Sequence, residues 1–412
     1  MFKIVRTPAE IKPFFDALTQ FFRWNHARYI QQFVLAIAIG WGRRNVSNIY
    51  RHIDAKTHRT RFNNFLYNER CDFPRMLRDA ATLLLSTLSL KPGEPIFLVI
   101  DDTKKDKRGK EIDGVGYIYD PVSSRKTPGH LYVTAVVRAG GFTIPWGIRL
   151  YVKKEHAERL GIPFRKTTEL AAELISSFES PLRGHPVRVL FDSFYLCSKV
   201  VRACRKRGFH FISTLKNNRN LLRGGRVLKA GTNKRSRFRR GRKRTATVGG
   251  SKGTKVFDYV DGGVFDLKGI GAVRVVYSRR RGEKAIAGLV TDCVGMSGGR
   301  IIGEYVRRWS IEVFFKDAKQ LLGLGQYQNR SRRAHVTHLH LVLLACALLT
   351  HRLILLAGAK AKRKRNGARR SLRYARNELR RMVWRDLVEI VEEATGEGES
   401  VFDTLDRLLI RA

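Results

Sequence analysis

Residues 300–322 read RIIGEYVRRWSIEVFFKDAKQLL. The stretch has no proline, and no glycine follows Gly303, so it predicts a helix from about Glu304 to Leu322. At about 100° per residue, five polar side chains fall within an arc of roughly 80°: Tyr305, Arg308, Glu312, Lys316 and Lys319. Apolar residues fill another sector, which we expect to pack on a core: Ile311, Phe314, Ala318, Leu321 and Leu322. By spacing alone, the polar strip is equally well an ordinary solvated helix face with ion pairs.

Four residues of the strip follow a fixed pattern: Tyr305, two residues, Arg308, three residues, Glu312, six residues, Lys319. The pattern resembles the Tyr-Arg-Glu-Lys signature of bacterial DDE transposases, of the type named after insertion sequence four and its relative, insertion sequence seven-oh-one. Lys316 lies on the same strip but outside the signature. The resemblance implies two aspartates upstream, each at the end of a strand.

Two apolar runs upstream end in aspartate. Ile96–Ile100 is followed by Asp101 and Asp102, and Val187–Phe191 is followed by Asp192. Both runs have the composition of buried strands. Asp101 and Asp102 point to opposite faces of their strand, so only one can join a site. The resemblance puts the first catalytic aspartate directly after the apolar run, which favours Asp101 and leaves Asp102 as the alternative. Asp192 has no such rival. For Asp101 and Asp192 alike, the ordinary reading is an aspartate that merely forms a turn after a strand.

Phosphoryl transfer at a DNA backbone needs an attacking oxygen, a stabilised leaving oxygen and relief of charge on the phosphorus. Two magnesium ions held roughly 3.5–4 Å apart supply all three. Magnesium prefers hard oxygen ligands and keeps some of its waters, so three carboxylates on rigid elements suffice. We therefore expect Asp101, Asp192 and Glu312 to be the catalytic residues and the ligands of Mg²⁺, for which Mn²⁺ can substitute.

The other residues of the strip are candidates for binding DNA. Arg308 lies one turn before Glu312, where its guanidinium can grip a phosphate through two parallel hydrogen bonds. Lys319 lies about two turns beyond Glu312, roughly 10 Å away, which suits a neighbouring phosphate. Tyr305 can bond a phosphate or stack on a base, and its ordinary reading is a core aromatic. Lys316 is the weakest candidate.

The composition points to a polyanion as partner. The 412 residues include 80 Lys+Arg against 36 Asp+Glu, a net charge of +44, and 43% are apolar, enough for a real core. A ribosome-associated or merely basic protein is the alternative. Five cysteines without a Cys-x-x-Cys pair indicate neither a disulfide framework nor a zinc site, which fits a reducing cytoplasm. Polar residues interrupt the apolar run Leu339–Leu356, which therefore predicts a buried helix rather than a membrane span.

The chain divides into five predicted segments of an α/β protein with a ribonuclease-H-like core. They are a helical, DNA-binding N-terminal domain (1–92), the first part of the core (93–215), a basic β-rich insertion (216–292), the second part of the core with the signature helix (293–357), and a basic helical tail (358–412). An inserted β subdomain resembles what the transposase family carries before its glutamate.

Three segments carry more detailed predictions. In the N-terminal domain, Phe14, Phe15, Leu18, Phe21 and Phe22 recur at helical spacing. Residues 42–66 predict two short basic helices, either a helix-turn-helix that reads element ends or an ordinary bundle. Residues 216–255 hold fifteen Lys or Arg and no acid, so this segment alone predicts disorder. Residues 358–385 hold twelve basic residues and one Glu.

These observations predict a transposase that cuts element ends and joins them to target DNA. Its expected partners are double-stranded DNA and a second copy in a paired-end homodimer, in the bacterial cytoplasm at the nucleoid and without a membrane. One rival is a ribonuclease-H-like nuclease that cleaves but does not join. The other is a non-catalytic DNA-binding protein derived from a transposase.

Overall fold

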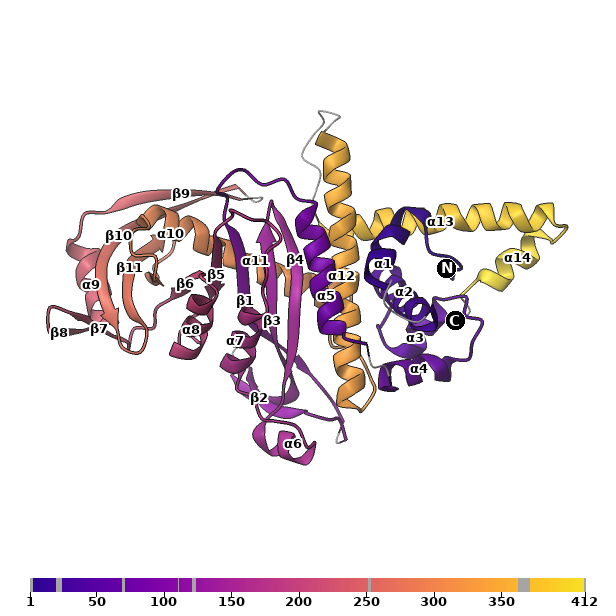
Figure 1. Cartoon of the computed structure of the whole chain (residues 1–412), viewed down its shortest axis with the longest axis horizontal. Helices are drawn as coiled ribbons and strands as arrows, with labels where there is room; N and C mark the ends of the chain where they lie inside the picture. The colour runs from indigo at the N-terminus through magenta and orange to yellow at the C-terminus, as the bar shows by residue number, and fades with distance from the viewer. Residues whose placement is uncertain are drawn as a thin grey trace.

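A computed structural model of the chain describes residues 3–19, 24–68, 71–109, 111–120, 124–250, 253–361 and 371–410. Phe21 and Phe22 of the predicted first helix lie outside these ranges, as do residues 251–252 and 362–370 of the two basic segments. The described chain forms a large mixed sheet with helices packed on it (Figure 1).

The N-terminal helices are η1 (Ala9–Ile11), α1 (Lys12–Thr19), α2 (Trp24–Ile39), α3 (Val46–Arg51), α4 (Arg59–Asn68) and α5 (Phe73–Ser86). The strands are β1 (Ile96–Asp106), β2 (Gly116–Asp120), β3 (Arg125–Ala139), β4 (Phe142–Tyr151), β5 (Val187–Phe191), β6 (His210–Thr214), β7 (Asn220–Arg223), β8 (Arg226–Lys229), β9 (Arg244–Gly250), β10 (Gly253–Leu267), β11 (Gly271–Arg280) and β12 (Ala287–Thr291). The remaining helices are α6 (Lys154–Arg159), α7 (Thr167–Ser176), α8 (Ser198–Lys206), α9 (Ala230–Arg240), α10 (Gly298–Tyr305), η2 (Val306–Arg308), α11 (Trp309–Leu321), α12 (Arg332–Ala361), α13 (Leu372–Gly396) and α14 (Val401–Leu408).

The strand order positions the site. β1 pairs in parallel with β5, and β5 pairs in parallel with β6. On its other side β1 pairs with β3, which forms an antiparallel hairpin with β4. This mixed arrangement fits the core of a ribonuclease-H-like protein. The sheet then continues without a break, because β6 pairs with β12 and the order runs on through β11 and β10 to β7 and β8.

The first predicted strand is longer than the sequence indicated. We expected it to end at Ile100, but β1 runs on through Asp106. Its parallel neighbour β5 ends at Phe191, whereas the antiparallel partner β3 stays paired with β1 as far as Asp106. Tertiary pairing with β3 therefore overrides the polar composition of Lys104–Asp106.

The signature helix is also different in detail. The prediction of one helix from Glu304 is wrong at its start, because α10 begins at Gly298, where the Ser297 side chain accepts a hydrogen bond from the Arg300 amide. A single 3₁₀ turn, η2, then separates α10 from α11, with Arg308 as its last residue. The predicted apolar sector is confirmed, since Ile311, Phe314, Ala318, Leu321 and Leu322 are all buried.

The basic segment 216–255 is ordered where it is described, contrary to the expectation for the segment alone. It forms β7, β8, α9 and β9. Helix α9 buries Ala230 and Phe238, and its Asn233 side chain accepts a hydrogen bond of 2.8 Å from the Tyr277 hydroxyl of β11. Burial of a few residues against a neighbouring sheet thus supplies the free energy that the composition lacks.

Helices α5 and α12 pack against β4, and α12 lies between the sheet and helices α1 to α4, where it also contacts α2 (Figure 1). Residues Arg332–Gly358 are long and apolar enough to span a membrane, and 67% of their apolar stretch is buried inside the protein. The core helix of a globular fold meets the same criterion of length and composition.

Helices α3 and α4, the two predicted short helices, contact each other. Arg51, Arg59 and Arg61 lie exposed on them. Whether these helices read DNA stays a prediction.

Candidate active site

The ends of two parallel strands bring two aspartates together. In the register of β1 and β5, Val99 lies beside Leu190. Two residues further along both chains, Asp101 comes beside Asp192. The pKa of Asp101 responds to this neighbour, because the charge of Asp192 contributes to raising it. Asp192 begins a turn in which its carboxylate accepts a 2.9 Å hydrogen bond from the Phe194 amide.

The two consecutive aspartates of β1 have different partners. Asp101 accepts a 2.6 Å hydrogen bond from Nη1 of Arg308, at the end of η2. Asp102, whose side chain alternates to the other face of the strand, accepts a 2.7 Å hydrogen bond from the buried Tyr195 hydroxyl. Only Asp101 is therefore bonded to the signature helix.

Arg308 joins two acids with one guanidinium. Its Nη1 donates to Asp101 and its Nη2 donates to Glu312 Oε1, each at 2.6 Å. Glu312 lies in the first turn of α11, where the helix dipole favours negative charge. The Arg308 and Asp101 side chains are only about one fifth exposed, at 19% and 20%. Charge-assisted bonds of this length, partly shielded from water, hold the strand and the helix in a fixed relation.

The remaining predicted residues lie at different distances from the acids. Tyr305 is half-buried, forms a hydrogen bond with the Thr214 side chain, and lies within range of the charges of Arg308, Asp192 and Asp101. Burial raises the pKa of the Tyr305 hydroxyl, which keeps it protonated. Lys319 donates a 2.9 Å hydrogen bond to the Lys104 carbonyl of β1. Lys316 is exposed on the outer side of α11.

The surroundings of Asp101 disfavour its ionised form. The pKa of its carboxyl is raised from 3.8 to about 6, mainly by burial; the charge of Arg308 lowers this pKa, and the charges of Asp102 and Asp192 raise it. Burial also lowers the pKa of the Lys319 ammonium. Acidic groups held close together against their mutual repulsion are typical of a site that binds a cation.

The donor chemistry fits a hard divalent metal ion at Asp101 and Asp192. Both offer carboxylate oxygens from adjacent strands, and Mg²⁺ and Mn²⁺ prefer such ligands. Within the described ranges, however, no group of three or more His, Cys, Asp or Glu side chains is gathered closely enough to hold a metal ion. The guanidinium of Arg308 lies between Asp101 and Glu312, which accounts for this spacing.

The sequence did not reveal several of these partners. Asp102 is bonded to Tyr195, Tyr305 to Thr214, and Lys319 to the Lys104 carbonyl. No sequence motif marks the segments that supply these three partners. The only signal was the position of Tyr195, three residues after Asp192. A bond between segments that are distant in sequence leaves no local pattern.

Comparison with known families identifies the chain. A family model described as DDE superfamily endonuclease matches residues 13–255, more than half of the sequence. The chain belongs to the DDE superfamily of endonucleases. A second model, described as a transposase DDE domain, matches residues 165–349. The two matches include Asp101, Asp192 and Glu312 between them. Comparison of this DDE endonuclease with curated proteins finds no match.

Proposed function

We propose that this DDE endonuclease is a transposase of the insertion-sequence-four or seven-oh-one type, which cuts element ends and joins them to target DNA. The observation that carries the proposal is the bridge of Arg308 between Asp101 and Glu312, with Asp192 beside Asp101. It connects three acids, distant in sequence, within one polar site on the sheet. Membership in the DDE family supports the reaction class.

Asp101 and Asp192 would hold Mg²⁺ or Mn²⁺, and Glu312 would complete the ligand set once Arg308 releases it. When bound, divalent ions supply the charge that activates the attacking oxygen and stabilises the leaving oxygen. Asp102 has a positioning role in this proposal, because Tyr195 already occupies its carboxylate. The wall of apolar strand residues behind the acids, Leu98 to Ile100, is fully buried and excludes water from that side.

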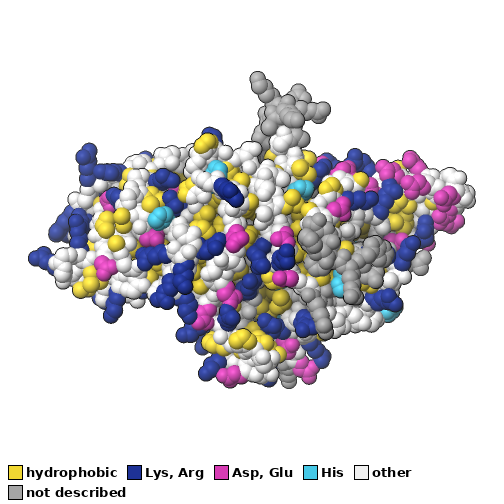
Figure 2. Space-filling model, in the orientation of Figure 1, with side chains coloured by type: hydrophobic (Ala, Val, Ile, Leu, Met, Phe, Trp, Pro, Cys, Tyr) yellow, Lys and Arg dark blue, Asp and Glu magenta, His cyan; other side chains and the backbone are white. Residues whose placement is uncertain are grey.

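Arg308 has a second role when DNA enters. Its two Nη groups, which donate to two carboxylates in this structure, are spaced so that they can also donate two hydrogen bonds to one phosphate. The protonated Tyr305 hydroxyl can donate to a phosphate oxygen, and Lys319 can neutralise the next phosphate along the helix. Lys and Arg side chains scattered widely over the face of the molecule in Figure 2 suit a long polyanion.

The reaction needs no redox partner. In the first step a water oxygen attacks the phosphorus, and the bond to the 3′ oxygen breaks to leave a 3′-hydroxyl. In the second step that hydroxyl attacks a target phosphodiester, and a target strand leaves with its own hydroxyl. A nuclease without joining activity would perform only the first step.

An assay with two DNA ends separates these functions. Radiolabelled duplex with a terminal 3′-hydroxyl and the same duplex with a 3′-deoxy end are each incubated with supercoiled plasmid and Mg²⁺. A transposase joins only the hydroxyl end to the plasmid. Cleavage without joined product would favour the nuclease, and binding without either product would favour the non-catalytic protein.

We further propose a homodimer that holds two element ends in the bacterial cytoplasm, at the nucleoid. The support is the charge of +44, which exceeds the number of phosphates that one chain is expected to contact on one duplex. Light scattering of the complex with a single end duplex tests it, since two chains and two duplexes are expected. One chain on one duplex at all concentrations would contradict the dimer.

A further inference from the structure

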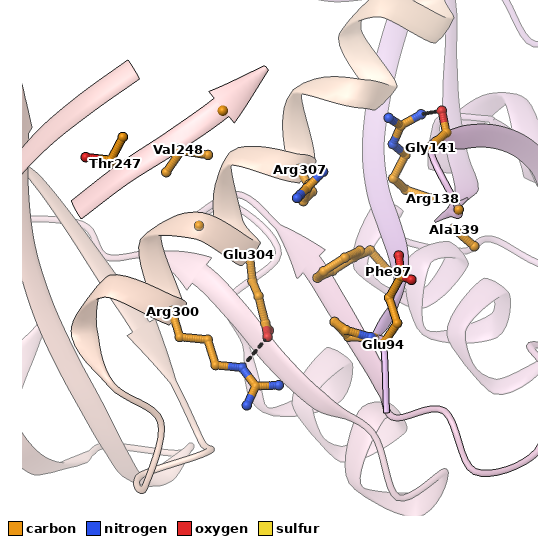
Figure 3. A pocket seen from close by; sticks show the side chains of 14 residues that line it. Glu94, Phe97, Arg138, Ala139, Gly141, Thr247, Val248, Arg300, Glu304 and Arg307 are labelled. Atoms are coloured by element: carbon orange, nitrogen blue, oxygen red, sulfur yellow. Dashed lines mark hydrogen bonds and ion pairs between the residues drawn. The ribbon is translucent and has the colours of Figure 1, made fainter. Parts of the chain in front are cut away.

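A second polar site lies on the sheet face that carries the acids. A cavity of about 310 Å³ opens between the start of β1, the β3–β4 turn, β9 and α10 (Figure 3). Arg138, Arg300 and Arg307 line it together with Glu94 and Glu304, and Phe97 and Val248 form its apolar part. Neither the family signature nor the catalytic acids include any of these residues.

Two arginines of this cavity, Arg300 and Arg307, have donors without a partner among the described residues. In Arg300 only Nε donates a hydrogen bond, at 2.7 Å to Glu304; neither Nη makes a hydrogen bond to a described residue. Arg307 makes no hydrogen bond or ion pair with any part of the chain that the structure describes, and it lines the cavity (Figure 3). A guanidinium with a free fork matches the paired oxygens of a phosphate.

A buried acid fixes the wall of the cavity. Glu304 is 6% exposed, and its second oxygen lies 3.5 Å from Nε of the buried Arg188 on β5, without a hydrogen bond. Removing a carboxylate from water is costly unless cations compensate it. Arg188 and Arg300 compensate the charge of Glu304. The lining as a whole holds three arginines, Arg138, Arg300 and Arg307, against the two acids Glu94 and Glu304, so its net charge is positive.

The cavity and the acids lie along one line. The contacts of the helical segment follow the same order as the residues of β1: Glu304 meets Arg188 beside Phe97, Arg308 meets Asp101, and Lys319 meets Lys104. Phe97 and Asp101 point to the same face of β1, four residues and about 13 Å apart. That distance corresponds to about four nucleotides along the axis of a duplex.

We infer that this cavity, built by Arg300 and Arg307 on the α10–η2 segment, binds a phosphodiester of the DNA strand about four nucleotides from the bond cleaved at Asp101. The inference rests on the proposed function, since it takes DNA in the active site as given. Lys319 marks the opposite side of the acids, so one strand would be held on both sides of the cleaved bond. A free nucleotide would use the same chemistry, and the experiment separates the two sources.

Gly303 gives a matched pair of variants. It lines the cavity on α10, and a Cβ at this position meets no atom within 4 Å. Gly303→Glu puts a carboxylate into the cavity, and Gly303→Gln adds a neutral side chain of the same size. Both replace a glycine within a helix, which favours folding. Arg202 is exposed on α8 and does not line the cavity, so Arg202→Glu controls for a general loss of positive charge.

Binding is measured by fluorescence anisotropy with a labelled 30-base-pair duplex in EDTA, and cleavage of the same duplex is measured in Mg²⁺. Gly303→Glu is expected to bind at least about tenfold more weakly than Gly303→Gln at low salt, because like charges oppose each other. Higher salt should reduce the difference in affinity between the two Gly303 variants, because it screens the repulsion. Arg202→Glu should bind within about twofold of wild type. Arg307→Gln should make the slope of log affinity against log salt shallower by about 0.9.

Equal affinities of the two Gly303 variants, or an equal loss with Arg202→Glu, would overturn the inference. If a Gly303 variant failed to fold, an unchanged salt slope for Arg307→Gln would overturn it as well. Displacement of a labelled deoxynucleoside monophosphate by cold monophosphate, lost in Gly303→Glu, would assign the cavity to free nucleotides instead. If wild type cleaved the duplex and the two Gly303 variants bound it equally well, only the role of the cavity would be rejected. Wild-type protein that neither bound nor cleaved the duplex would reject the proposed function.

Discussion

At the scale of single residues, Arg308 decides how two neighbouring aspartates differ. Both follow the same apolar run, and the sequence alone left the choice between them open. Arg308 reaches Asp101 and Glu312, whereas Tyr195 reaches Asp102. The alternation of a strand made a difference between the two predictable. The identity of their partners depended on segments more than 90 residues away in the sequence, which no local pattern encodes.

The two aspartates can be tested against each other with isosteric substitutions. Asp101→Asn is expected to abolish DNA cleavage in Mg²⁺, because it removes a charged oxygen ligand. Asp102→Asn should retain cleavage within about tenfold of wild type, since it still accepts the Tyr195 hydrogen bond. Initial rates of duplex nicking measure both. A dead Asp102→Asn variant beside an active Asp101→Asn variant would reverse the assignment.

The raised pKa of Asp101 has a consequence for stability without metal. Its folded-state pKa of about 6 lies above the ordinary value of 3.8. Between these values the folded chain keeps a proton that the unfolded chain has released, so ionisation of Asp101 lowers the free energy of unfolding as pH rises from about 4 to 6. Asn cannot ionise, so the free energy of unfolding of Asp101→Asn does not contain this loss. Relative to wild type, the free energy of unfolding of Asp101→Asn should therefore increase by about 1–3 kcal/mol between pH 4.5 and pH 7.

Urea unfolding in EDTA at the two pH values measures that gain. The free energy of unfolding of wild type is subtracted from that of Asp101→Asn at each pH, and the two differences are compared. Any effect of losing the Arg308 partner that does not depend on pH then cancels. A difference that stayed constant, or that moved in favour of wild type at pH 7, would contradict the raised pKa.

At the scale of elements, the sequence predicted helix and strand types better than their ends. The apolar sector of α11 followed directly from its 3.6-residue period. The start of α10 at Gly298 and the extension of β1 to Asp106 depend on a cap and on pairing with β3, which outweigh composition. Order in the segment 216–250 likewise comes from contacts with β10 and β11, outside the segment itself.

The junction between the N-terminal helices and α11 depends on one buried arginine. Arg44 is 4% exposed, and its guanidinium donates to the carbonyls of Ile37, Gly40, Gly42 and Leu321, the last at the end of α11. Burial, with the nearby charge of Arg376, lowers its pKa only to about 10, so it remains charged at neutral pH. Among 80 Lys and Arg residues, nothing in the sequence distinguishes this one.

Arg44→Met should lower the free energy of unfolding by about 3 kcal/mol or more, because it leaves several buried carbonyls without a donor. The adjacent Arg43 is exposed, so Arg43→Met should change it by less than about 0.5 kcal/mol. Urea unfolding followed by circular dichroism gives both values. Similar effects of the two substitutions would show that the buried bonds do not secure this junction.

At the scale of the whole molecule, charge is unevenly distributed. Residues 386–406 at the end of α13 and in α14 hold eight acids and no base, and Figure 2 shows acidic side chains gathered at that end of the molecule. The basic side chains belong mainly to the rest of the chain. The tail is also part of the packed structure, because α13 buries Ala375, Leu379 and Met382 and Arg380 donates to the Ile39 carbonyl.

DNA binding should depend steeply on salt. Each phosphate that the protein neutralises adds about −0.9 to the slope of log affinity against log salt concentration. With basic residues concentrated in 216–255 and 358–385, we expect a slope steeper than about −3. Fluorescence anisotropy of a labelled duplex between 50 and 300 mM salt, concentrations of the order at which such slopes are measured, gives the value. A shallower slope would show that these segments do not contact DNA.

The central claim is that Asp101, Asp192 and Glu312 form one catalytic set for DNA. The most direct test measures cleavage and binding of the same terminal-repeat duplex by wild type, Asp192→Asn and Glu312→Gln in Mg²⁺. We predict that both variants bind the duplex with nearly wild-type affinity and that neither produces cleaved or joined DNA. Cleavage near the wild-type rate by either variant would contradict the account.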